Sequence, residues 1–331
     1  MLSQRLSAVN GGHLNTRAPP AVWRAQLGSR MVSLRWPCKE QLGKVMLHRP
    51  NTAFLVCVIS CVLPALALAG TLDQIKASGE IRIGYRTDAP PLAFNDSSGQ
   101  AAGYSVDLCK RIATAVKEQL KLANLKVTFV PLTSANRLDA IVKNQADIEC
   151  GATTMTLSRE RKVDFTLMTF VTGGSLLSLA DSNVNTLSDV AGKSVAVVTG
   201  TTSQPALESA LKKNLIDAKV VAVADRAEAM KQLDAKQVVA FASDQIVLIG
   251  QMIDSAAPSK YSLAHDLFSY EPYGFVVRRD DADFRLVANG ALAQVYRTGQ
   301  IEQLFGRWFG QYGVKPSPIL TAMYALQALP D

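Results

Sequence analysis

The chain has 331 residues, a formal net charge of +7 and 48% apolar residues. Its length suits about two domains, and the sequence shows neither a low-complexity tract nor a fixed-period repeat. Residues 1–69 hold eight of the 35 basic side chains and one of the 28 acidic ones, so residues 70–331 carry 27 of each sign. This neutral body argues against a nucleic-acid-binding protein that relies on net positive charge.

An apolar run without a charged side chain covers residues 53–69 and follows His48 and Arg49 after three intervening residues. It ends in Ala67-Leu68-Ala69, the small-x-small pattern that signal peptidase accepts. The run is short for a membrane-spanning helix and contains Pro64. The pattern therefore favours a cleavable export signal over a permanent anchor, which is the alternative.

We expect residues 1–69 to be a leader that is removed on export to the periplasm. Residues 46–69 form the signal peptide in this interpretation, because Met46 stands at a normal distance before the apolar run. Residues 1–45 show no amphipathic period and are interpreted as an over-long start or an extended leader.

From residue 80 onward, strand and helix patterns alternate, which predicts parallel sheets flanked by helices. The expected strands cover residues 80–85, 126–131, 146–150, 193–198, 219–223, 238–242 and 273–277. The expected helices cover residues 105–122, 137–143, a segment ending at 213, and 226–233, 283–298 and 300–309. Consecutive prolines at 90 and 91 predict an extended turn after the first strand.

The last two helices need a sheet to pack on, and the nearest candidate is the one formed by the first strands. We therefore expect the chain to cross between two lobes twice, near residues 167–175 and 270–276. The first lobe would consist of residues 70–170 plus 275–331, and the second of residues 171–274. Two lobes joined by two crossings form a clamshell with a ligand cleft between them.

Loss of the leader leaves two cysteines, Cys109 on an expected helix and Cys150 at an expected strand end. Both fall in the first lobe, and an oxidising compartment permits a disulfide between them. Two separate buried thiols are equally compatible with the sequence.

Two stretches, residues 150–154 and 198–202, place threonines after a glycine at the end of a strand. They supply Thr153 and Thr154 in one lobe and Thr201 in the other. Free backbone N–H groups at such ends bind anions. Plain helix capping explains either stretch alone, but one in each lobe favours a shared anion site.

Arg159 lies five residues after Thr154 and can point back at the same site with a bidentate guanidinium. The alternative is a surface arginine in the basic run with Arg161 and Lys162. Asp244 follows the strand 238–242, where a carboxylate suits an ammonium group or simply caps a helix.

Four further polar residues stand at element ends. Arg86 ends the first strand, and Ser134 and Arg137 stand at the start of a helix. Arg226 begins the helix 226–233, where its charge opposes the helix dipole and suggests a functional role. Each of the four could also be a surface residue.

These residues lie in motifs of a known family. Residues 71–331 resemble the extracytoplasmic solute-binding proteins, family 3, of ABC amino-acid importers, most closely the glutamate/aspartate-binding branch. The resemblance rests on LDQI at 72–75, GEIRIG at 79–84, GYSVDLC at 103–109, TSANR at 133–137, DIECGATT at 147–154, Arg159, GTT at 200–202, Asp244, Tyr273-Gly274 and RWF at 307–309.

The resemblance implies an α/β, two-lobe periplasmic binding protein of type II, with two crossing strands at the hinge. It implies no catalysis and no cofactor, and the neutral charge of residues 70–331 already argues against a nucleic-acid partner. The implied partners of this monomer are a small ligand, L-glutamate or L-aspartate, and permease subunits in the inner membrane. Arg159 would hold the ligand α-carboxylate with help from Thr154 and Thr201, and Asp244 the α-ammonium.

In the same branch, positions matching Arg86, Ser134 and Arg137 surround the side-chain carboxylate. Here Arg226 stands where a histidine is common, and Ala152 where close relatives have a serine. Four arginines against Asp244 predict a site with surplus positive charge, in which a neutral amino acid would leave guanidinium groups unpaired.

Two other classes are less favoured. A periplasmic dehydratase of the arogenate or cyclohexadienyl type is the alternative on the same fold. The body has one histidine, His265, and two cysteines, which makes a zinc site or a histidine-based triad hard to assemble. A receptor input domain would be expected to have a long helix or a second membrane segment after the fold, and the sequence up to Asp331 shows neither.

Overall fold

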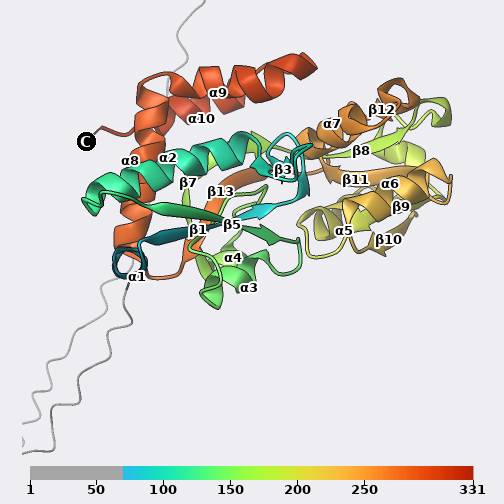
Figure 1. Cartoon of the computed structure of the whole chain (residues 1–331). Helices are drawn as coiled ribbons and strands as arrows, with labels where there is room; N and C mark the ends of the chain where they lie inside the picture. The colour runs from blue at the N-terminus through green and yellow to red at the C-terminus, as the bar shows by residue number, and fades with distance from the viewer. Residues whose placement is uncertain (1–69, 331) are drawn as a thin grey trace, which may run out of the picture. The chain divides into compact units, whose positions relative to one another are not determined.

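The computed structural model describes residues 70–330 of the chain (Figure 1). The leader expected at residues 1–69, with its parts 1–45 and 46–69, lies outside the described residues. None of the described helices combines the length and the apolar composition that a membrane span needs.

Two five-stranded sheets frame this part of the chain, on the left and right of Figure 1. The first sheet has the order β5 (Lys126–Leu132), β1 (Glu80–Arg86), β6 (Ile148–Glu149), β13 (Glu271–Arg278), β7 (Val163–Thr172). The second has the order β10 (Lys219–Val223), β9 (Ser194–Val198), β11 (Ala240–Asp244), β8 (Gly174–Leu179), β12 (Tyr261–Leu263). A small antiparallel sheet consists of β2 (Asp88–Ala89), β3 (Ala93–Asn95) and β4 (Ala101–Ala102).

Both large sheets are mixed, which corrects the expectation of parallel sheets. β1 pairs in parallel with β5 and β6, and β9 pairs in parallel with β10 and β11. However, β13 is antiparallel to β6 and β7, and β8 is antiparallel to β11 and β12. β8 and β13 arrive from the other sheet rather than through a helical crossover, and a strand that enters in this way is free to run in the opposite direction.

The chain passes between the two sheets twice, as the sequence predicts. β7 leads into β8, and β12 leads back through a loop to β13. The two crossings touch, because a Cβ atom built on Gly173 would lie 2.5 Å from the backbone oxygen of Ser269. A side chain at position 173 would therefore push the crossings apart.

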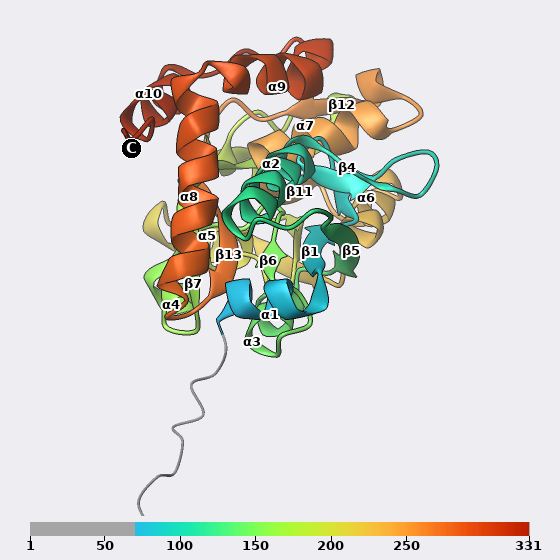
Figure 2. The ribbon, with the colours of Figure 1, turned by 60° about the vertical axis from the view of Figure 1, so that its left-hand side comes forward.

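The helices of the first lobe cover both faces of its sheet (Figures 1 and 2). Phe275 and Val277 of β13 pack with one group of helices, whereas Val276 points to the other face, where it packs with Ile141. This alternation is that of a strand buried on both sides. The first group consists of α2 (Tyr104–Gln119), α8 (Ala282–Arg297), α9 (Gln300–Phe309) and α10 (Pro318–Leu326). The other face is covered by α3 (Arg137–Val142) and α4 (Leu157–Glu160). Helix α1 (Thr71–Ser78) precedes β1.

The second lobe repeats this arrangement. Leu233 and Leu248, from α6 (Arg226–Asp234) and α7 (Gln245–Asp254), belong to the apolar cluster on one face of the sheet. Leu207 of α5 (Ser203–Lys213) belongs to the cluster on the other face. Short 3₁₀ helices cover Ala180–Ser182, Leu187–Val190, Pro258–Lys260 and Gly310–Tyr312.

Two differences from the expected elements stand out. The helix expected to reach residue 122 ends at Gln119, because Lys121 adopts a left-handed φ of 52°. Helix α10 was not expected; Leu320 and Met323 bury it in the same apolar cluster as α2 and α8.

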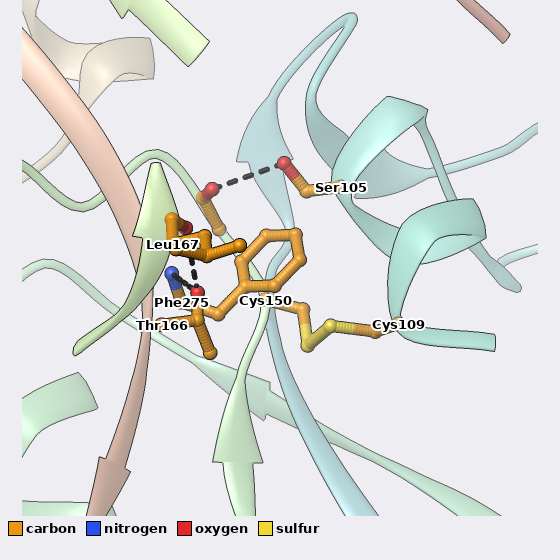
Figure 3. Close-up of a disulfide and its surroundings, with 7 residues drawn as sticks. Ser105, Cys109, Cys150, Thr166, Leu167 and Phe275 are labelled. Atoms are coloured by element: carbon orange, nitrogen blue, oxygen red, sulfur yellow. Dashed lines mark hydrogen bonds between the residues drawn. A yellow bond between two sulfur atoms is a disulfide. The ribbon is translucent and has the colours of Figure 1, made fainter. Parts of the chain in front are cut away.

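A disulfide joins Cys109 of α2 to Cys150, which follows β6 (Figure 3). Both residues are fully buried. One turn earlier on α2, Ser105 Oγ donates a hydrogen bond of 3.1 Å to the backbone oxygen of Gly151. The helix is thus attached by two bonds to the start of the loop that carries Thr153 and Thr154.

Replacement of both cysteines by alanine should lower the free energy of unfolding by up to about 4 kcal/mol. The chain-entropy model gives this size for a closed loop of about 40 residues, and the two cysteines are 41 positions apart. Urea unfolding of the oxidised protein and the double variant measures the difference. Equal unfolding midpoints would contradict the stabilising role.

Candidate functional site

The nine predicted ligand residues come from both lobes. Arg86, Ser134, Arg137, Thr153, Thr154, Arg226 and Asp244 are buried, and Arg159 and Thr201 are partly buried. Burial of so many polar and charged side chains is unfavourable unless each finds a partner.

Several of these partners lie in the opposite lobe. The Thr154 and Thr202 hydroxyl oxygens are 3.1 Å apart, and Arg137 Nη2 donates to Gly200 O at 3.4 Å. Another close approach occurs at α7, where a Cβ atom on Gly250 would lie 2.0 Å from Pro90 O. The structure therefore brings the two predicted Gly-Thr stretches together, across the contact between the lobes.

Arg159 points back at the loop before it, as its spacing from Thr154 predicts. Its Nη1 atom donates a 2.7 Å hydrogen bond to the backbone oxygen of Thr154. Thr156 caps α4 by accepting from the backbone N–H of Arg159 at 3.2 Å, which fixes the start of the helix. Burial lowers the pKa of Arg159, although Glu149, Asp244 and Glu271 act in the opposite direction. Arg159 and Asp244 thus belong to one electrostatic group.

Asp244 ends β11 and is held by two hydroxyl groups. Tyr273 donates to its Oδ2 atom, and Ser203 Oγ donates to Oδ1 at 3.2 Å. Burial, followed by the negative charge of Glu271, raises the pKa of Asp244 to about 6. A carboxylate that is costly to ionise in this position would gain from a cationic neighbour.

Sequence reasoning named Tyr273 only as part of a family motif and did not identify Glu271. Both residues lie on the same side of the crossing strand β13. Glu271 accepts hydrogen bonds of 2.7 Å from Thr154 and from Thr202, and it is almost fully buried. Ser269 also donates to Glu271, at 2.6 Å. The sequence did offer one signal for Glu271, because it is an acidic residue within the predicted crossing, two positions before Tyr273.

These contacts constrain the threonine hydroxyls. Each hydroxyl has one proton, and those of Thr154 and Thr202 are directed at Glu271. The Thr201 hydroxyl donates its proton to the backbone oxygen of Val198, 2.7 Å away. In this arrangement the three hydroxyls do not have a spare proton for a ligand carboxylate, so the arginines and backbone N–H groups remain as its donors.

A second group of residues surrounds Asp88. Its Oδ1 atom lies 2.7 Å from Arg86 Nη2 and 2.8 Å from Arg226 Nη1. The contact with Arg226 is an ion pair without hydrogen-bond geometry. Arg86 Nε, Ser134 Oγ, and Nε and Nη1 of Arg226 are buried without a hydrogen-bond partner among the described residues. These atoms belong to three of the residues predicted to bind a side-chain carboxylate.

Arg137 completes this group. Its Nε atom donates to Thr153 Oγ1 at 2.9 Å, and its Nη1 atom donates to Ser134 O. Burial and the positive charge of Arg159 lower the pKa of Arg137 to about 9. Burial and the charge of Arg226 lower that of Arg86 to a pKa of about 10.

The predicted surplus of positive charge is not found among the described residues of the site. Four arginines were weighed against Asp244, but Asp88, Glu149 and Glu271 are also present, which makes four groups of each sign. Glu149 is fully buried beside the arginines, and its desolvation raises its pKa. Within residues 70–330, no three His, Cys, Asp or Glu side chains are grouped as metal ligands would be.

Two mixed α/β lobes joined by two crossings, with buried charges where they meet, define a periplasmic binding protein fold. The chain belongs to the bacterial extracellular solute-binding proteins, family 3, whose family model matches residues 81–311. The L-glutamate/L-aspartate-binding protein of Pseudomonas aeruginosa is 32% identical over 79% of this chain and 87% of its own length. The glutamate/aspartate import solute-binding protein of Escherichia coli K12 is 30% identical over 80% of this chain and 89% of its own.

Solved structures agree on the fold. An ancestral arginine-binding protein bound to arginine superposes with a TM-score of 0.63 at 27% identity, covering 70% of this chain and 99% of its own. An ancestral amino acid-binding protein, described as a precursor of cyclohexadienyl dehydratase, gives a TM-score of 0.62 at 29% identity, with 73% and 100% covered.

The raised pKa of Asp244 predicts a pH dependence of stability. The folded protein holds this proton more tightly than the unfolded chain, so the contribution is full below pH 4 and is lost as pH rises through about 6. Between pH 4 and 7, the unfolding free energy of the wild type relative to Asp244→Asn should fall by up to about 3 kcal/mol. Denaturant unfolding of both proteins measures this difference, and a constant value would contradict the raised pKa.

Proposed function

We propose that this protein is the periplasmic substrate-binding component of an ABC importer for an acidic amino acid, L-glutamate or L-aspartate. The observation that carries the proposal is the position of the unfilled polar atoms. Arg86, Ser134 and Arg226 present buried donors without an acceptor among the described residues, in the same charged group as Arg159 and Asp244. Such donors are satisfied by an anionic group.

The proposed ligand has two carboxylates and one ammonium group, and the site offers groups of opposite charge for each of them. Arg159 would bind the α-carboxylate, together with backbone N–H groups near Thr153, Thr154 and Thr201. Asp244 would bind the α-ammonium group, with Glu271 as a second carboxylate nearby. Arg86, Ser134, Arg137 and Arg226 would bind the side-chain carboxylate. The relatives named for glutamate and aspartate support this ligand class.

The remaining parts of the proposal concern transport. The protein would be a periplasmic monomer without catalytic activity, and its closed form would bind permease subunits in the inner membrane. Closure of the lobes around the ligand would give the permease a surface that the open form lacks. The import function in the name of the Escherichia coli relative supports this role.

The alternative function is that of a dehydratase, which the likeness to the precursor of cyclohexadienyl dehydratase suggests. That structure is itself described as an amino acid-binding protein, which favours binding over turnover. An assay with arogenate and prephenate as cyclohexadienyl substrates separates the two functions. Turnover at an enzymatic rate would contradict a purely binding role.

A thermal-shift screen of residues 70–331 against the twenty amino acids tests the ligand class. A ligand that binds only the folded state at 100 times its Kd stabilises it by about 2.7 kcal/mol. Glutamate or aspartate should therefore raise Tm by several degrees, and glutamine and asparagine much less. A shift with neutral or cationic amino acids alone would contradict the proposal.

The substitution Arg159→Ala should weaken glutamate binding by about 2–5 kcal/mol, the usual range for removing one partner of a buried charge pair. The exposed Arg161, two residues further along the chain, provides the matched control, and Arg161→Ala should leave binding unchanged. Isothermal titration calorimetry measures both Kd values. An Arg159→Ala protein that is folded and binds normally would remove Arg159 from the site.

A further inference from the structure

Asp88 is the acidic residue that contacts arginines of both lobes. It begins β2, two residues after Arg86, and its carboxylate pairs with Arg86 in its own lobe and Arg226 in the other. A second contact between the lobes occurs at the same residue, where Gln251 of α7 donates to its backbone oxygen at 3.2 Å. Asp88 is therefore fixed against the second lobe by its side chain and by its backbone.

Arg226 needs such a partner for two reasons. It is the first residue of α6, where a positive charge is opposed by the helix dipole. Its side chain is also only 3% exposed, and a buried guanidinium without a counter-charge is strongly destabilising. On α6 itself, the N-cap Asp225 directs its carboxylate at the backbone N–H of Glu228, 2.9 Å away.

One carboxylate does not neutralise two guanidinium groups. Arg86, Arg226 and Asp88 together carry one net positive charge, and Arg86 Nε, Arg226 Nε and Arg226 Nη1 keep unfilled donors among the described residues. Burial would raise the pKa of Asp88, but Arg226 and Arg86 together lower it, which keeps the carboxylate ionised. Both the charge and the donors suit one additional carboxylate.

We propose that Asp88 is a specificity-determining residue, which sets the charge of this part of the site so that it selects a ligand with one side-chain carboxylate. This inference rests on the proposed function and names the residue that tunes it. Without Asp88, two buried positive charges would face the ligand side chain. Without Arg226, Asp88 would cancel Arg86, and these residues would contribute no net charge to recognition.

A charge series tests the inference, with the ratio of the Kd for glutamine to the Kd for glutamate as the readout. The two ligands have nearly the same shape, so any change in lobe closure affects both and cancels in the ratio. Asp88→Asn raises the net charge of the trio from +1 to +2, and Arg226→Gln lowers it to 0. The double variant restores +1 with Arg86 alone.

The ratio should rise about tenfold or more in Asp88→Asn and fall by a similar factor in Arg226→Gln, because a unit charge a few ångströms away changes the energy of a carboxylate by at least this much. The double variant should return to within a few-fold of the wild type. Asp181→Asn is the matched control, since Asp181 forms an exposed ion pair with Lys236 and both side chains are 67% exposed. Its ratio should not change.

The outcomes distinguish this inference from the proposed function. If the wild type binds glutamate but the Kd ratios of the variants do not follow the charge series, the role of Asp88 is overturned and the proposed function is not affected. A wild type that binds neither glutamate nor aspartate overturns the proposed function and this inference with it. If Asp88→Asn fails to fold, the double variant and Arg226→Gln still decide, because they predict ratios that differ by about tenfold.

Discussion

The burial of charge between the two lobes is the constraint on which the rest of the structure depends. Four arginines and four carboxylates are brought together where water is largely excluded, and each must be compensated by a group from another element. The two hinge crossings, the Gly-Thr stretches and the start of α6 all serve to place these charges. Because several pairs join groups from different lobes, the electrostatic balance of the site is a property of both lobes together.

Much of the frame could be predicted from local patterns. The alternation of strand and helix signals gave two lobes, and the need of the last helices for a sheet gave two crossings. The direction of β13 could not be predicted, because strand direction depends on which sheet a crossing segment enters and not on its own residues. The same limit applies to α10, whose role is defined by its packing in the core of the first lobe.

The candidate site shows the same division. Its arginines and Asp244 were found because they stand at element ends and match motifs. Asp88, Glu149 and Glu271 were missed because they have no spacing of their own that marks a site. Their importance comes from the buried groups that they face, which only tertiary structure decides. As a result, the net positive charge of the site was overestimated from the sequence, although its arginines were identified.

The attachment of helix α2 to the loop after β6 has a mechanical consequence. The covalent bond between Cys109 and Cys150, together with the Ser105 contact, makes the loop that holds Thr153 and Thr154 part of a stiff body. Rotation of one lobe against the other must then be absorbed elsewhere in the chain. The lobes are joined at Gly173 and at the loop between β12 and β13, so a rotation of this kind would have to be accommodated in these two stretches.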